Sequence, residues 1–211
     1  MKKPYHTLVK HYENCLEKHG DSHLGVDWPN LDDAEKRYKV MLDIVALSEN
    51  NNQPISLLDF GCGTAHLFEY ILNNNYQNFQ YSGLDISQKF VDVAKIKYPN
   101  NLFICLDILD AKEELQSFDY FILNGVFTEK RELSFDAMWN YFTEMISVVY
   151  SKCNKGIAFN VMSNHVDWHR EDLFHVSHDL LTQFLCENIT RDYIIRNDYG
   201  LYEYTVYIYK N

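Results

Sequence analysis

The sequence predicts an α/β fold in which a seven-stranded, mostly parallel sheet lies between two layers of helices. From Ser56 onward, short apolar runs alternate with segments of helical periodicity, a pattern typical of sheets with helices on both faces. Apolar residues run almost continuously through the first five of these runs, so both faces of those strands should be buried. The last two runs are separated by only four residues, which predicts that an antiparallel hairpin ends the sheet.

Each element has its own signal in the chain. The five buried strands are expected at 56–60, 80–85, 102–106, 118–124 and 156–162, and the hairpin at 193–197 and 202–209. The connecting helices are expected at 66–72, 88–97, 135–150 and about 178–187. Ser87 and Ser134 stand where N-caps of two of these helices belong. Two more helices, 7–18 and 31–48, precede the first strand and are expected to form a helical cap.

Composition limits the class of protein. With 211 residues and 46% hydrophobic content, the chain can bury one sizeable core. We therefore expect one domain over 1–211, divided into an N-terminal helical cap (1–50) and a core (56–210). A formal net charge of -11 would repel a phosphate backbone, so nucleic acid is not the expected partner.

The cysteines and the N-terminus favour a cytoplasmic protein. The five cysteines are scattered and form no C-x-x-C pair, which argues against a disulfide framework or a zinc ribbon. No apolar stretch is long enough to form a signal peptide or a membrane span.

The segment 57–65, Leu-Leu-Asp-Phe-Gly-Cys-Gly-Thr-Ala, predicts a ligand-binding turn between the first strand and its helix. Asp59 lies at the end of the strand, and Gly61 and Gly63 flank Cys62 in the turn. Glycine allows positive φ and a close approach of the backbone to a ligand, and a helix N-terminus offers free N–H groups. Two glycines in a tight turn can also be purely structural, so the following strands matter.

Carboxylates also end the second and third strands. Asp85 follows Gly83-Leu84, and Asp107 follows the third strand. A carboxylate at the end of the second strand can accept hydrogen bonds from a ribose diol. A nicotinamide dehydrogenase would share this acid, but its G-x-G-x-x-G/A loop needs a small residue where this chain has His66.

With these motifs, 56–209 resembles class I S-adenosylmethionine-dependent methyltransferases, which have a Rossmann-like three-layer fold and close their sheet with an antiparallel hairpin. The resemblance implies S-adenosylmethionine as cofactor and S-adenosylhomocysteine as product. It assigns the loop Asp59, Gly61, Cys62 and Gly63 to the methionine part and Asp85 to the ribose. Around the adenine it implies contacts from Ile86, Asp107 and Ile108. Ala65 stands where a third glycine is usual, a departure that a helix start should tolerate.

Two further residues are candidates for the cofactor site. Arg37, on the helix before the first strand, could bind the methionine carboxylate through its forked donors, although a solvated arginine is the alternative. Asn124 ends the fourth strand, where ligands of open parallel sheets bind. It is a candidate both for cofactor binding and for positioning the acceptor in catalysis.

The loop after the fifth strand is the expected substrate wall. His165 or His169 could act as general base, Trp168 could offer an aromatic face, and Arg170 could pair with an anionic substrate. A solvated loop with structural histidines is the alternative. Arg196 and Tyr199, beside the hairpin turn, are weaker candidates for substrate binding.

The histidine spacing does not favour a metal site. His165 with His169, and His175 with His178, could share a helix face, but no acidic partner has a recognisable ligand spacing. We therefore predict no metal.

The leading functional hypothesis is methyl transfer to a small polar or anionic metabolite, with methylation of oxygen favoured over methylation of nitrogen. The segments 124–129, 167–170 and 197–202 are similar to a bacterial branch associated with surface-polysaccharide biosynthesis, which includes candidates for methylating a capsule phosphoramidate. A catalytically silent cofactor-binding module in a complex and a nicotinamide-dependent reductase are the alternatives. Neither the acceptor nor the oligomeric state follows from the sequence.

Overall fold

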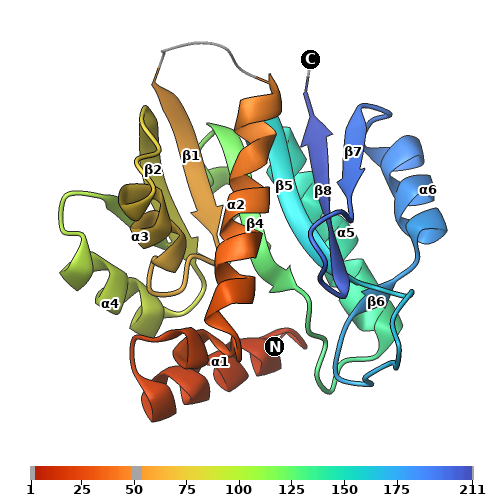
Figure 1. Ribbon diagram of the computed structural model, residues 1–211, viewed down its shortest axis with the longest axis horizontal. Helices are drawn as coiled ribbons and strands as arrows, with labels where there is room; N and C mark the ends of the chain where they lie inside the picture. Colours follow the sequence, from red (N-terminus) through yellow and green to blue (C-terminus); the bar gives the residue numbers. More distant parts are fainter. Residues whose placement is uncertain (1–2, 49–53, 211) are drawn as a thin grey trace.

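The computed structural model describes residues 3–48 and 54–210 and contains one sheet with the predicted architecture (Figure 1). Five parallel strands come first and the antiparallel hairpin ends the sheet, in the order β3-β2-β1-β4-β5-β8-β7. The strands are β1 (Ile55–Phe60), β2 (Phe79–Asp85), β3 (Leu102–Cys105), β4 (Phe118–Phe127), β5 (Cys153–Ser163), β6 (His175–Val176), β7 (Tyr193–Arg196) and β8 (Glu203–Tyr209).

The prediction of seven strands was one short, because the sheet of the described residues has eight. The additional strand, β6, pairs with the end of β5 and lies off the main path. It is two residues long, too short to give a periodicity that sequence reasoning can detect.

Helices cover both faces of the sheet because the strands are apolar on both sides. One core cluster joins the strands to α5 (Phe135–Lys152) and α6 (His178–Asn188). The other joins them to α2 (Leu31–Ser48), α3 (His66–Asn73) and α4 (Gln88–Lys97). The side chains of Phe121 and Ile122, neighbours in β4, lie in different clusters, as alternation along a strand requires.

One of the two predicted serine caps forms. The Ser134 side chain accepts a hydrogen bond from the Ala137 N–H and so caps α5. Ser87 occupies the N-cap position of α4 but caps nothing with its side chain. Its hydroxyl instead donates to Glu13 of α1 (His6–His19) at 2.6 Å, so the prediction of a cap at Ser87 was wrong.

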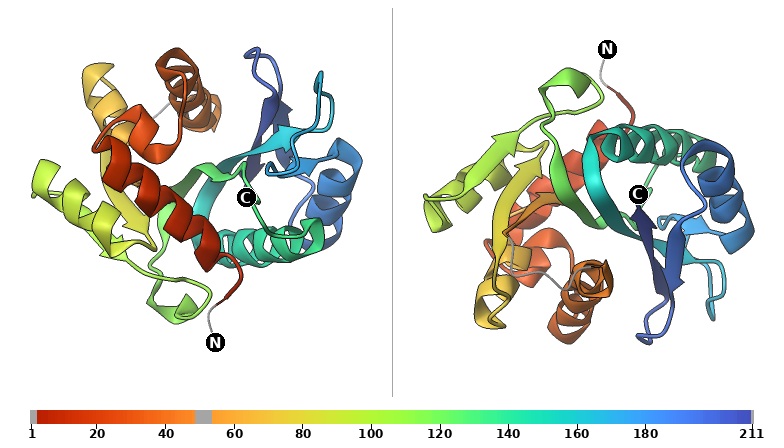
Figure 2. Two further views of the ribbon diagram at one scale, coloured as in Figure 1. Left: turned by 90° about the horizontal axis from the view of Figure 1, so that it is seen from below. Right: turned by 90° about the horizontal axis from the view of Figure 1, so that it is seen from above.

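The N-terminal helices have two different places. The second of them, α2, packs on one face of the sheet, through residues such as Met41 and Ile44. By contrast, α1 and the short helix η1 (His23–Val26) lie across the carboxyl ends of the strands, as the view from below shows (Figure 2). Only this part of the predicted helical cap covers the strand ends. Residues 1–2 and 49–50 of that cap lie outside the described residues.

None of the helices that the structure describes combines the length and the apolar character needed to cross a membrane.

Candidate functional site

A cavity lies between the carboxyl ends of β1 to β4 and helix α1. About 980 Å³ of empty space lies between its walls, counting the part open to solvent. At this point the chain order reverses between β1 and β4, and open α/β sheets bind ligands at such a reversal. Its walls come from α1, from the loops after the first four strands and from α5.

The turn after β1 forms one wall of the cavity. Gly61 and Gly63 line it, with φ of 73° and 52°, a region that favours glycine. A Cβ on Gly61 would lie 2.8 Å from Cγ2 of Val126, so only glycine leaves this wall open. The predicted ligand turn therefore faces the cavity through both glycines.

Asp85 joins two loops of the cavity. Its carboxylate accepts the Gly63 N–H at 2.9 Å and the Ser87 N–H at 2.8 Å. Burial raises the pKa of Asp85 to about 6, although these backbone N–H groups oppose the rise. A carboxylate has about four acceptor positions, so Asp85 lines the cavity with capacity for a ligand's hydroxyl groups.

Asp107, at the third strand end, is held by the N-terminal helix. The Tyr5 hydroxyl lies 2.8 and 3.0 Å from its two oxygens, and Nε2 of His6 lies 3.2 Å away. Tyr5 also stacks on Tyr141 of α5. Ile86 and Ile108 line the same part of the cavity, which is therefore apolar with a carboxylate at its rim.

Two residues of the predicted cofactor loop face away from the cavity. Cys62 is buried against Gly83, whose added Cβ would lie 2.8 Å from its Sγ. Asp59 is 3% exposed and accepts a 2.7 Å hydrogen bond from the Tyr81 hydroxyl. Neither residue is among those that line the cavity. Asp59 can therefore affect ligand binding only indirectly, by supporting the glycine turn that follows it.

The burial of Asp59 should make stability depend on pH. Burial raises its pKa from the usual 3.8 to about 7, the Tyr81 hydrogen bond lowers it in part, and Asp85 raises it further. Because the folded state then binds more protons than the unfolded state between these values, the free energy of unfolding should fall as pH rises from about 4 to about 7.

An Asp59→Asn variant should lose much of this slope, whereas Tyr81→Phe should steepen it, because that change removes a hydrogen bond favouring the ionised form. Urea unfolding at pH 5 and pH 8 measures the slope. Equal slopes in the wild type and the Asp59→Asn variant would contradict the assignment.

The turn also contains a strained residue. Ala65 has φ 66° and ψ 38°, a left-handed conformation that costs a non-glycine residue about 1–2 kcal/mol. The expectation that a helix start tolerates alanine did not anticipate this, because Ala65 is the residue before the helix rather than its first turn. Its side chain is fully buried.

The end of β4 forms the wall beside the glycine turn. Asn124, Gly125 and Val126 line the cavity there. Oδ1 of Asn124 is buried and has no hydrogen-bond partner. Since an unsatisfied buried acceptor is costly, this oxygen is suited to receive a donor from a ligand.

A buried polar chain supports this wall from behind. Oδ1 of Asn160 accepts the Gly125 N–H at 2.7 Å, and Nδ2 of Asn160 donates to Glu203 at 2.9 Å. Nε of Arg37 lies 2.8 Å from both oxygens of Glu203. The Arg37 guanidinium also stacks on Trp28, 4.3 Å from the ring centre. Arg37 is thus paired within the protein and does not line the cavity.

The predicted substrate wall lies away from the cavity. His165, Trp168, His169 and Arg170 are all exposed, and none of them lines it. The segment between β5 and β6 is not helical, so the histidines do not pair as expected for one helix face. Instead His165 lies against His178 and His169 against His175, with ring centres 6.0 and 4.5 Å apart.

Arg196 and Tyr199 also lie outside the cavity lining. Arg196 donates to both oxygens of Asp198, at 2.7 and 3.0 Å. The Tyr199 hydroxyl lies 2.9 Å from that of Thr205, and its ring packs in the core cluster on the α2 face. Both side chains are accounted for by the packing and pairing of the hairpin.

Sequence reasoning missed the residues that α1 and the loop after β4 bring to the cavity. Tyr5, Tyr12 and Glu129 line it. The Glu129 side chain is only 13% exposed. Its position two residues after a strand's carboxyl end was the available signal.

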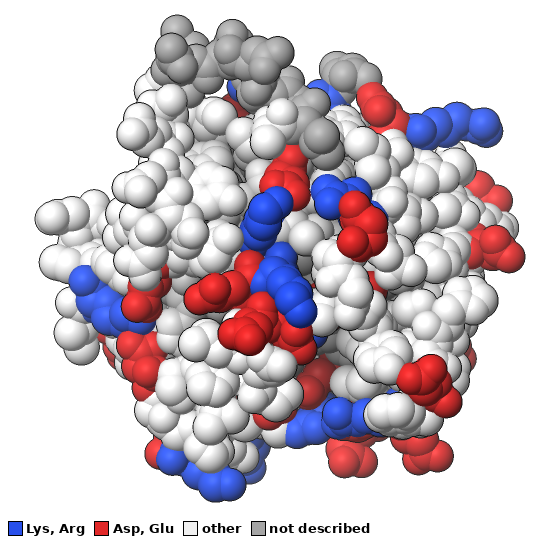
Figure 3. Space-filling view, viewed as in Figure 1, with Lys and Arg blue, Asp and Glu red and all other residues white. Residues whose placement is uncertain are grey.

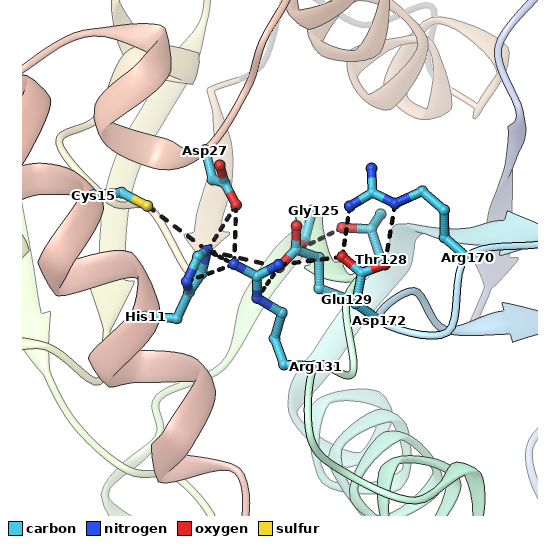
Figure 4. A network of polar contacts seen from close by, with 9 residues as sticks. All are labelled: His11, Cys15, Asp27, Gly125, Thr128, Glu129, Arg131, Arg170 and Asp172. Atoms are coloured by element: carbon cyan, nitrogen blue, oxygen red, sulfur yellow. Dashed lines mark hydrogen bonds and ion pairs between the residues drawn. The ribbon is translucent and has the colours of Figure 1, made fainter.

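Glu129 belongs to a polar network that links α1 to two loops (Figure 4). His11 and Asp27 are joined at 2.7 Å. Arg131 lies 3.2 Å from both Glu129 and Asp172. Arg170 pairs with the same Asp172, which connects the predicted substrate loop to the rim of the cavity.

One group of side chains has the spacing of metal ligands. His11, Cys15 and Asp27 bring their ligand atoms within 4.8 Å of one another. The guanidinium of Arg131 lies against them, however, with Nη2 2.6 Å from Nδ1 of His11. A cation of the protein therefore stands beside the position that a metal ion would take, and like charges oppose a second one.

Comparison with known proteins agrees with this geometry. The family model described as a methyltransferase domain matches residues 58–142. A Mycobacterium tuberculosis (strain ATCC 25618 / H37Rv) protein, Rv1506c, provisionally named a methyltransferase, is 26% identical over 167 residues, covering 76% of this chain and 96% of that protein.

Solved structures share the fold. Magnesium protoporphyrin IX methyltransferase (ChlM) from Synechocystis PCC 6803, crystallised with bound SAM (S-adenosylmethionine), has a TM-score of 0.64 at 16% identity. That match covers 100% of this chain and 98% of ChlM. The plantazolicin methyltransferase BamL was solved with a triazolic desmethylPZN analog and SAH (S-adenosylhomocysteine). It has a TM-score of 0.64 at 14% identity, and the match covers 98% of this chain and 90% of BamL.

Proposed function

We propose that the chain, a class I S-adenosylmethionine-dependent methyltransferase, methylates a small polar metabolite, on oxygen rather than nitrogen. The cofactor would lie in the cavity between α1 and the strand ends. The observation that carries the proposal is the set of acceptors around this cavity. Asp85 and Asn124 face it from opposite walls, with the glycine turn between the strands that carry them.

The residues present suit each part of the cofactor. Asp85 would accept the ribose hydroxyls, and Ile86 and Ile108 would enclose the adenine, with Asp107 at its edge. Gly61 and Gly63 would let the methionine part approach the backbone. The unpartnered Oδ1 of Asn124 would accept a hydrogen bond from the methionine ammonium. Asp59, Cys62 and Arg37 would act only indirectly, as supports of these walls.

Bound S-adenosylmethionine supplies a methyl group already activated by a positive sulfonium. The protein's own task is then to align an acceptor and to exclude water. Helix α1 and Tyr5, the residue before it, suit the second task because Tyr5 and Tyr12 line the cavity. Tyr5 and Glu13 also hold the helix to the strand-end loops through hydrogen bonds to Asp107 and from Ser87.

The lining favours a polar acceptor without net negative charge. Asp85, Asp107 and Glu129 line the cavity, whereas the lining residues include no Lys, Arg or His. This supports the polar part of the sequence hypothesis and weighs against its anionic part. On the face seen in Figure 3, acidic and basic side chains are intermixed, which gives no broad basic area for a nucleic acid there. A role in surface-polysaccharide biosynthesis and the participation of His165, His169, Trp168, Arg170, Arg196 and Tyr199 stay predictions from the sequence.

Calorimetric titration with S-adenosylmethionine, S-adenosylhomocysteine and NADH tests the cofactor assignment. We expect the first two to bind with one site per chain and NADH not to bind. Transfer of a labelled methyl group from S-adenosylmethionine to neutral sugars, amino alcohols and sugar phosphates would then test the acceptor. Preference for the sugar phosphates would contradict the neutral-acceptor proposal, and binding of NADH alone would contradict the function.

A further inference from the structure

Glu129 lines the cavity and has one buried carboxylate oxygen without a hydrogen bond. Its side chain is 13% exposed, and Oε2 is buried without a hydrogen bond. Nε of Arg131 lies 3.2 Å from this oxygen as an ion pair, and Nε2 of His11 lies 3.9 Å away. Figure 4 shows Glu129 between Arg131 and the end of β4. A buried acceptor left in this state is suited to a donor on a ligand.

The position of Glu129 relates it to the reacting end of the cofactor. It follows Asn124, Gly125 and Val126, which line the same cavity at the end of β4. The carboxylates of Asp85 and Asp107 belong to the loops after β2 and β3, where the proposed function has the ribose and adenine. Glu129 is thus the lining carboxylate on the β4 side, where the acceptor would meet the methyl group.

We propose that Glu129 is a catalytic residue that accepts the proton of the methyl acceptor, whose reacting group is a hydroxyl. This inference rests on the proposed function. In the transfer, the bond from sulfur to the methyl carbon breaks and its electron pair stays on sulfur. A bond forms between the acceptor atom and that carbon, and the acceptor's proton passes to Glu129. Every atom and charge is then accounted for, without a further reactant.

The surroundings suit Glu129 to this role. Burial raises its pKa, the Arg131 cation opposes the rise, and Asp27 and Asp172 add to it. A carboxylate whose pKa lies nearer neutrality is a better proton acceptor at physiological pH. Tyr12 lines the cavity beside it, and burial together with the charge of Glu129 raises the pKa of the Tyr12 phenol. Tyr12 therefore stays protonated and does not compete for the proton.

Sinefungin tests this inference without knowledge of the acceptor. This cofactor analogue carries a carbon with an ammonium group where S-adenosylmethionine carries the sulfonium methyl, so a carboxylate facing that position should bind it. Calorimetry compares its Kd with that of S-adenosylhomocysteine, which lacks the group. The variants are Glu129→Gln and, as matched control, Glu132→Gln, which changes an exposed glutamate in the same loop.

The wild type and Glu132→Gln should bind sinefungin more tightly than S-adenosylhomocysteine. In Glu129→Gln this preference should fall about tenfold, the effect of losing one charge-assisted hydrogen bond. The affinity for S-adenosylhomocysteine should be the same in all three proteins. An unchanged preference in Glu129→Gln would overturn the inference alone, whereas a wild type that binds neither ligand would overturn the proposed function as well.

A second measurement needs no variant. In the wild type, the preference for sinefungin should fall between pH 8 and pH 5.5, as Glu129 gains a proton. The groups facing Glu129 are His11 and Tyr12 from α1, Asp27 after η1, and Arg131 and Asp172. Protonation of Asp85 changes the Kd of both ligands alike, so its effect cancels in the ratio of the two Kd values. A preference independent of pH over this range would overturn the inference even if the Glu129→Gln variant does not fold.

Discussion

Replacing Asp85 with alanine should weaken the binding of S-adenosylmethionine by about 100-fold, because the ribose hydroxyls would lose a charged acceptor. The same change leaves the N–H groups of Gly63 and Ser87 without the carboxylate that now holds them. Both loops that flank the cavity would then lose their common anchor. Calorimetric titration of the wild type and the variant measures the loss.

The control for this variant is Asp92→Ala, which removes an exposed carboxylate from α4. Its affinity should equal that of the wild type. Asp85→Asn should bind the cofactor weakly as well, because an amide offers one acceptor oxygen where the carboxylate offers two. Thermal unfolding separates a loss of binding from a loss of fold. Wild-type affinity in a folded Asp85→Ala variant would show that the ribose lies elsewhere.

Replacing Glu203 with alanine should lower the free energy of unfolding by about 3–5 kcal/mol, the usual effect of removing one partner from a buried ion pair. Glu203 is 1% exposed. Its carboxylate accepts hydrogen bonds from the Arg37 guanidinium and from the Asn160 amide. Removing it leaves a cation and an amide donor without their partner. Urea unfolding at pH 7 measures the difference.

An exposed ion pair provides the comparison. Lys36 and Asp33 lie 3.1 Å apart on α2 with side chains 50% and 29% exposed, and Lys36→Ala should change the free energy of unfolding by less than about 1 kcal/mol. Because Asn160 also holds the Gly125 N–H, Glu203→Ala should in addition weaken cofactor binding. A loss of stability no larger than that of Lys36→Ala would contradict a stabilising role for the hydrogen-bonded side chains of Arg37, Glu203 and Asn160.

The parallel strands were predictable because their signal is local. Strands buried on both faces need apolar runs, and such runs lie within the observed strands Ile55–Phe60, Phe118–Phe127 and Cys153–Ser163. The chain order of parallel strands then brings their carboxyl ends to one edge. Gly61, Gly63, Asp85 and Asn124 could be expected at that edge for this reason, and all four line the cavity.

Side-chain direction was less predictable. Asp59 stands one residue before Phe60, yet Phe60 lines the cavity and Asp59 turns to Tyr81. Alternation along a strand means that an error of one residue exchanges the faces. The loop after β5 posed another difficulty, because a polar, histidine-rich loop has the same composition whether it borders a site or faces solvent.

The sequence by itself therefore determined the α/β architecture, the hairpin and the turn and carboxylates at the strand ends, because hydrophobic periodicity and turn chemistry act between near neighbours in the chain. Only the tertiary structure decided which side chains share the cavity. It brought Tyr5 to Asp107, Arg131 to His11 and Arg37 to Glu203. These partners lie far apart in the chain, and their meeting depends on how α1 and α2 pack against the sheet, which no local pattern encodes.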